Sequence, residues 1–98
     1  MEIVWTRSAR RDLAAHFDYL APRNLDAALR LDEAVRQAVE GLIDFPHRGR
    51  PGRRDGTREL VIRGHPYIVV YTPGTARIAI LRVLHTAQEW PPRGTSRP

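Results

Sequence analysis

The sequence predicts an α+β fold in which an N-terminal strand is followed by an α-helical hairpin packed on a small antiparallel sheet, in the order β-α-α-β-β-β. Two stretches between residues 6 and 44 carry apolar side chains at helical spacing. Three apolar runs between residues 57 and 84 are separated by turn residues, which is typical of an antiparallel sheet. A chain of 98 residues has room for one hydrophobic core, so we expect a single domain over residues 1–91.

The first helix is predicted to follow a short β-prone strand at residues 2–5 (EIVW). Thr6 or Ser8 can cap this helix, since a hydroxyl there accepts a hydrogen bond from a free N–H of the first turn. Pro22 ends it, because the proline ring disfavours helical geometry in the preceding residue. The apolar side chains between these limits share one helical face, at Ala9, Leu13, Phe17 and Leu20.

A second helix is predicted from Asn24, which is a favourable N-cap residue, to about residue 44. Its apolar stripe consists of Ala28, Leu31, Val35, Ala38 and Leu42. Two helices joined by a few residues lie antiparallel, so the pair forms a hairpin. The apolar face of this hairpin requires a second layer to cover it, and the strands that follow can supply that layer.

The second half of the chain predicts a loop and three strands. Residues 44–56 hold two Pro, three Gly and four Arg without apolar periodicity, which indicates a loop. Strands are predicted at residues 57–63, 67–71 and 76–84, and the middle one is apolar on both faces, as a central strand should be. Strict alternation in the last strand places one set of side chains on a single face, namely Ile78, Ile80, Arg82 and Leu84.

The two ends of the chain and its composition complete this picture. We expect the strand at residues 2–5 to join the sheet, because an isolated strand leaves its backbone groups unpaired. Residues 92–98 are low in apolar content and are expected to form a flexible tail. The chain has no Cys, no signal segment and no apolar run near the roughly 18 residues of a membrane span, so we expect a cytoplasmic protein.

The charge of the chain is unevenly distributed. All sixteen basic residues are Arg, and the formal net charge is +5. Residues 1–45 hold six Arg and eight acidic residues, whereas residues 46–98 hold ten Arg and three acidic residues. A basic second half favours an acidic partner, either nucleic acid or an acidic protein segment, and a solvated basic face is the alternative.

Four segments together resemble the RelE/ParE toxins of bacterial type II toxin–antitoxin modules. They are, in order, GTRELV (56–61), PYIVVY (66–71), ILRVLH (80–85) and QEWP (88–91). Each segment alone is weak, but their order and spacing are specific, and the resemblance covers about residues 2–91. It implies a fold of the RelE/ParE type and a toxin as the function.

The two branches of this superfamily imply different chemistries. The RelE branch cleaves messenger RNA on the ribosome, which requires groups that activate the 2′-OH, stabilise the phosphorane and protonate the leaving oxygen. In that branch an Arg typically follows the Tyr that opens the central strand, and basic residues are usual on the preceding strand. Here Ile68 follows Tyr67, and Glu59 and Val61 align with the basic positions. The sequence therefore departs from the nuclease pattern where the chemistry would lie.

The resemblance is closer to the ParE branch. It implies a toxin that inhibits DNA gyrase by binding, that uses no catalytic residue and no cofactor, and that a cognate ParD-like antitoxin neutralises. The runner-up interpretation is a RelE-like endoribonuclease that uses Arg82 and His85. A third is an inactive module that still binds antitoxin. His85 has a simpler interpretation as well, because it can end a strand and bond into the following turn.

The expected partner-binding residues lie in the basic loop, in the strand that follows it and near residue 90. They are Arg48, Arg50, Arg53, Arg54, Arg58 and Trp90. The loop arginines can equally be solvated charges, and Trp90 can instead fold back over the small core. The four His residues lack metal-ligand spacing, so no metal site is expected.

Overall fold

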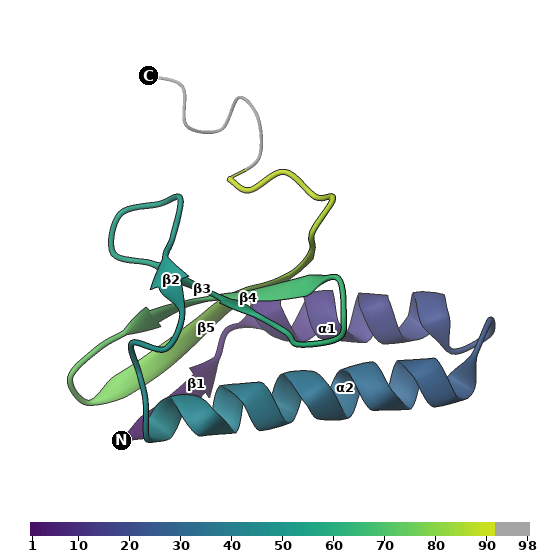
Figure 1. Cartoon of the computed structure of the whole chain (residues 1–98), viewed down its shortest axis with the longest axis horizontal. Helices are drawn as coiled ribbons and strands as arrows, with labels where there is room; N and C mark the ends of the chain where they lie inside the picture. The colour runs from purple at the N-terminus through teal and green to yellow at the C-terminus, as the bar shows by residue number, and fades with distance from the viewer. Residues whose placement is uncertain (92–98) are drawn as a thin grey trace.

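The computed structural model describes residues 1–91 and shows two helices packed on one side of a five-stranded sheet (Figure 1). The expected tail at residues 92–98 lies outside the described residues. The elements run in the order β1 (Glu2–Trp5), α1 (Arg7–Leu20), α2 (Leu25–Glu40), η1 (Gly41–Ile43), β2 (Arg50–Pro51), β3 (Arg58–Val61), β4 (Tyr67–Pro73) and β5 (Arg77–His85).

Both helices begin where the sequence predicts. The Thr6 hydroxyl accepts a hydrogen bond from the Ala9 N–H at 3.2 Å, and the Asn24 side chain accepts one from the Ala27 N–H at 3.1 Å. The second helix remains α-helical to Glu40 and finishes with the 3₁₀ turn η1. In the described part of the chain, neither helix is long and apolar enough to cross a membrane.

The sheet has the strand order β1-β5-β4-β3-β2. The three predicted strands form the antiparallel unit β3-β4-β5, and β1 joins its edge as expected. However, β1 pairs with β5 in parallel, so the sheet is mixed and not wholly antiparallel. Tight turns enforce antiparallel pairing, whereas two helices and three strands separate β1 from β5 and leave the direction of β1 to the tertiary packing.

The main core lies between the helices and the sheet. It includes Leu13 of α1, Val35 of α2 and the buried side chains Val69, Ile80 and Val83 of the two central strands. A smaller cluster of Ile68, Val70 and Leu84 lies on the opposite face of the sheet, which we call the distal face. The sheet is therefore apolar on both sides at its centre, as the sequence of β4 predicts.

A β-bulge in β5 overturns the predicted alternation of that strand. Val70 pairs with Arg82 while Tyr71 pairs with Ile80, so Leu81 is an extra residue without a partner. Ile80 accordingly faces the helices, but Leu84 belongs to the distal cluster. One inserted residue moves every later side chain to the other face, because the side-chain period of a strand is two.

Candidate functional site

The distal face carries several of the side chains that the sequence analysis linked to function. Its centre is apolar, with Ile68, Val70 and Leu84 buried and Leu81 and Trp90 packed against them. Ile68 occupies the position that follows the opening Tyr of the central strand, and here it contributes to a hydrophobic cluster. The chain after β5 returns over this face, on the side away from the helices (Figure 1).

Glu59 lies beside this cluster and is buried, with 1% of its side chain exposed. One carboxylate oxygen accepts a hydrogen bond from Arg50 Nη2 at 3.2 Å. The other accepts one from the backbone N–H of Arg53 at 3.1 Å and lies 3.4 Å from Arg53 Nε. A buried carboxylate needs such partners, because removal from water is costly for an unpaired charge. Two of the expected partner-binding arginines therefore also neutralise an internal acid.

Trp90 lies between two arginines on the distal face. The guanidinium of Arg54 is 5.9 Å from the centre of the Trp90 ring, and that of Arg82 is 5.6 Å from it. Arg53 Nη1 donates to the Trp90 carbonyl at 3.4 Å. The indole N–H is buried and has no hydrogen-bond partner in the described part of the chain. Trp90 thus packs against the distal cluster, in agreement with the interpretation that it folds back over the small core. Two arginines also lie close to its ring.

The basic loop is held firmly against the sheet. The buried Tyr71 hydroxyl accepts from the Gly49 N–H at 2.9 Å and donates to the Pro46 carbonyl at 2.7 Å. A Cβ at Gly49 would lie 2.8 Å from the Tyr71 ring, so only glycine fits there. Arg58 donates to the Gly49 carbonyl at 2.7 Å, and the Arg48 guanidinium stacks on the Phe45 ring at 4.8 Å.

The structure therefore separates the expected partner-binding residues into two groups. Arg53 and Arg54 lie with Trp90, and Arg50 joins them through Glu59. The other two lie apart from Trp90: Arg48 stacks on the Phe45 ring, and Arg58 of β3 donates to the His47 and Gly49 carbonyls.

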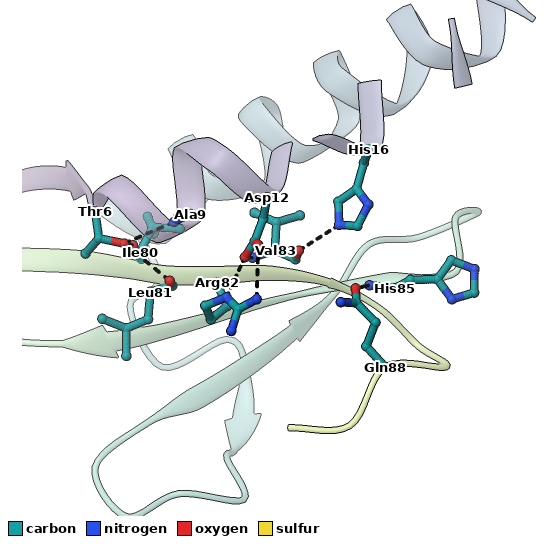
Figure 2. Close-up of polar contacts among 10 residues, drawn as sticks. All are labelled: Thr6, Ala9, Asp12, His16, Ile80, Leu81, Arg82, Val83, His85 and Gln88. Carbon is teal, nitrogen blue, oxygen red and sulfur yellow. Dashed lines mark hydrogen bonds and ion pairs between the residues drawn. The ribbon is translucent and has the colours of Figure 1, made fainter. Parts of the chain in front are cut away.

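Helix α1 covers the edge of β5 where β1 ends (Figure 2). The Thr6 hydroxyl lies 2.8 Å from the Ile80 carbonyl oxygen, at the bulge. Asp12 accepts a hydrogen bond from the Val83 N–H at 2.9 Å, and His16 Nε2 lies 2.8 Å from the Val83 carbonyl oxygen, which can accept its proton. Side chains of α1 thus satisfy both the N–H and the C=O of Val83, in the place where a neighbouring strand would otherwise pair.

Arg82, one of the two runner-up catalytic residues, is bound to Asp12. Arg82 Nε and Nη2 donate to the two Asp12 oxygens at 2.6 and 3.1 Å. The hydrogen bond to Asp12 and its negative charge raise the pKa of Arg82 and outweigh the opposing effect of burial. A guanidinium held in a bidentate pair has fewer donors left for a phosphate.

His85, the other runner-up residue, faces the helices and not the distal face. Its ring meets the Tyr67 ring edge to face, with centroids 5.1 Å apart. Nδ1 accepts a hydrogen bond from the Ala87 N–H at 3.1 Å, and the His85 N–H donates to Gln88 Oε1 at 2.8 Å. Figure 2 shows this ring directed away from Arg82. The structure does not bring Arg82 and His85 together.

A pocket near the turn of the helical hairpin was missed by the sequence analysis. Its volume is about 470 Å³, and it lies between the two helices and the β3–β4 turn. Burial raises the pKa of Tyr67 in its wall, and the nearby phenol of Tyr19 raises it further. The lining includes Tyr19, Leu20, Arg30, His65, Tyr67 and His85; we call it the Tyr67 pocket. No local signal marked this pocket, because its lining comes from segments that are far apart in the chain and that only folding brings together.

A second hollow of about 800 Å³ lies between α1 and α2, with Trp5, Phe17 and Leu29 in its walls. Within residues 1–91, no group of three or more His, Cys, Asp or Glu side chains is arranged to hold a metal ion.

Comparison with known proteins agrees with this fold. Residues 3–90 match the family described as the ParE toxin of the type II toxin–antitoxin system parDE. The chain is 40% identical over 89 residues to the protein Y4kP of Sinorhizobium fredii, covering 91% of this chain and 92% of the relative. It is 33% identical over 87 residues to the toxin RelE2 of Caulobacter vibrioides, covering 89% and 97%.

Two solved structures share the architecture. A chain of the chromosomal ParDE toxin–antitoxin system of Pseudomonas aeruginosa (P. aeruginosa) aligns with a TM-score of 0.79 and 27% identity, covering 87% of this chain and 95% of that chain. A chain of the toxin–antitoxin complex RelBE2 of Mycobacterium tuberculosis aligns with a TM-score of 0.56 and 34% identity, covering 89% and 92%. The protein therefore belongs to the ParE toxin family of type II toxin–antitoxin systems, within the ParE/RelE superfamily.

Proposed function

We propose that this toxin is ParE-like in mechanism: it inhibits DNA gyrase by binding it, without cleaving a nucleic acid. One observation carries the proposal, namely that residues 1–91 do not gather free cations and proton donors around one point of the distal face. Arg82 is paired with Asp12, His85 faces the helices, and the centre of the distal face is apolar. Cleavage of a phosphodiester needs such groups positioned together.

Glu59 strengthens this proposal. It lies beside the distal cluster, and its charge is already matched by Arg50 and Arg53. A carboxylate at that position repels a developing phosphorane dianion, and its arginine partners are held in place by it. What the distal face offers instead is an aromatic ring flanked by arginines, which suits adhesion to a macromolecule.

We further propose that a ParD-like antitoxin neutralises the toxin. The solved relatives are described as toxin–antitoxin systems or complexes. The second half of this chain is strongly basic, so an acidic segment that orders on binding would be complementary to it.

Purified gyrase, relaxed plasmid, ATP and this protein test the proposal directly. We expect loss of supercoiling, or trapping of a cleaved DNA complex, and restoration of activity when the antitoxin is added. Transcripts in a translation extract that receives the same amount of the protein should remain intact. Unaltered supercoiling with no trapped complex, at a large excess of the protein over gyrase, would exclude gyrase as the target.

A RelE-like endoribonuclease is the second candidate, because the chain is 33% identical to a protein named toxin RelE2. It predicts cut transcripts in a translation extract and loss of cutting in both Arg82→Ala and His85→Ala. Induction in a bacterial host separates a third possibility: an inactive module would bind antitoxin but cause no growth arrest.

A further inference from the structure

We propose that the Tyr67 pocket binds a small phosphate monoester. The site lies on the helical side of the sheet, and the arginines and Trp90 of the distal face do not line it. It is therefore separate from the surface proposed to contact gyrase, and its existence does not depend on which macromolecule the toxin attacks.

The polar groups of the Tyr67 pocket are hydrogen-bond donors. They comprise the guanidinium of Arg30, the phenols of Tyr19 and Tyr67, and the imidazoles of His65 and His85. No Asp or Glu belongs to the lining. A set of donors that includes a permanent positive charge and no carboxylate selects an anion.

These donors are available to a ligand. Within residues 1–91, Arg30 forms no ion pair, and the phenols of Tyr19 and Tyr67 and the ring of His65 form no hydrogen bond. His85 Nδ1 accepts from the backbone of Ala87, so its Nε2 carries the proton and can donate. The contrast with the distal face is direct, because Arg50, Arg53 and Arg82 are all occupied by carboxylates.

The wall of the Tyr67 pocket is also preorganised. The Tyr67 ring lies between His16 and His85, with ring centroids 4.8 and 5.1 Å away. His16 is in turn fixed by its hydrogen bond to the Val83 carbonyl at 2.8 Å. Gly64, at φ +81°, forms the turn that carries His65 to the rim. A ligand would therefore meet aromatic groups that are already positioned, which lowers the entropic cost of binding.

The size and chemistry of the pocket favour a phosphate monoester over a bare anion. A volume of about 470 Å³ lies within the range of small-molecule sites and exceeds the needs of inorganic phosphate alone. Leu20 and Leu31 offer an apolar wall for the organic part of a ligand. A phosphate monoester presents three terminal oxygens, which can accept bonds from donors that approach from separate elements.

Titration of the full ¹⁵N-labelled chain with adenosine 5′-monophosphate tests this site. We expect saturable shifts of the amides of Gly64, His65, Tyr67 and His85. Adenosine, which lacks the phosphate, should not bind, and inorganic phosphate should shift the same amides more weakly. The expected result is a single site with these residues at its centre.

Variants separate this site from general attraction to a basic protein. Arg30→Gln should weaken binding about tenfold or more, because a charged donor is lost. Tyr67→Phe removes one hydroxyl and should weaken binding about threefold or more. Arg54→Gln removes the same charge from the basic loop and should change the affinity less than about twofold. Thermal unfolding of each variant verifies that the fold is retained.

Three results would overturn the proposal. The first is the absence of saturable shifts at about 10 mM ligand, where even weak specific binding is visible. The second is shifts confined to the basic loop, or equal weakening by Arg30→Gln and Arg54→Gln, which would indicate non-specific charge attraction. The third is adenosine binding as tightly as its monophosphate, which would mean that the phosphate is not recognised.

Discussion

The two faces of the sheet are both apolar at the centre, but their charged groups are used differently. On the distal face, Arg50 and Arg53 are paired with buried Glu59, and Arg82 is paired with Asp12. On the helical face, Arg30 borders a pocket of aromatic donors and forms no ion pair within residues 1–91. Arg50, Arg53 and Arg82 are thus paired with internal acids, whereas Arg30 is not.

This difference shows why the number of arginines is a poor guide to chemistry. A guanidinium that neutralises a buried carboxylate stabilises the fold, and few of its N–H donors remain for another ligand. The proposed mechanism rests on this point, because Arg50, Arg53 and Arg82 of the distal face are already paired with internal acids. Each of the first two predictions removes one of these internal acids and measures how much it contributes to stability.

The largest effect is expected from Asp12→Ala. The substitution removes the bidentate partner of Arg82 and the acceptor of the Val83 N–H. The Asp12 and Arg82 side chains are only partly exposed. We therefore expect the unfolding free energy, measured by urea denaturation, to fall by about 2–4 kcal/mol. Asp18→Ala, an exposed carboxylate on the same helix, is the control and should change stability little. Equal effects of the two substitutions would contradict the role assigned to Asp12.

A smaller loss is expected from Glu59→Ala. It removes the anchor of Arg50 and Arg53, but both arginines are about half exposed and can be hydrated afterwards. We expect a loss of about 1–3 kcal/mol and faster amide exchange across residues 49–56. Glu2→Ala is the matched control, because Glu2 pairs with Arg77 at the surface. Unchanged exchange in the loop would show that Glu59 does not hold it.

Truncation of Trp90 should cost less again. Trp90→Ala exposes part of the distal cluster and removes the ring between Arg54 and Arg82, so we expect a loss of about 1–2 kcal/mol. Trp90→Phe keeps an aromatic ring and removes a buried N–H that lacks a partner in the described chain. The Phe variant should therefore lie closer to the wild type. Thermal unfolding monitored by circular dichroism distinguishes the two, and the opposite order would contradict the proposed packing.

The smallest effect concerns alkaline pH and the helical face. The folded-state pKa of Tyr67 is raised above its ordinary value of 10.0, so the native protein retains this proton where the unfolded chain loses it. Stability from this group is complete below pH 10 and decreases as pH rises through the folded-state pKa. Urea denaturation between pH 8 and about 11 should show this decrease. Tyr67→Phe should show a weaker decrease, and an identical profile would remove Tyr67 as its cause.

Local signals predicted much of the fold. The caps at Thr6 and Asn24 act within three residues, so the beginnings of both helices follow from the adjacent sequence. The strands β3 and β4 have local apolar patterns and a glycine turn between them, and both form where expected. The two-residue strand β2 was not predicted, because its pairing depends on a loop anchored by Tyr71 from another strand.

The candidate site was less predictable for a related reason. The basic loop and Trp90 were identified from composition, and part of that group does assemble on the distal face. The pairing of Arg82 with Asp12 joins residues seventy positions apart, so neither residue type nor spacing indicates it. Alternation places Arg82 and His85 on opposite faces, but the bulge at Leu81 decides which face each of them takes, and strand alternation alone cannot reveal a bulge.

The amino-acid sequence by itself determined the order of elements, the ends of the helices, the apolar centre of the sheet and the membership of the toxin superfamily. These depend on interactions between residues close in the chain or on patterns that repeat along it. Only the tertiary structure decided the parallel direction of β1, the bulge in β5 and which arginines remain free for a ligand. The physical reason is that a charge becomes committed or available only when folding brings an acid from a distant segment beside it.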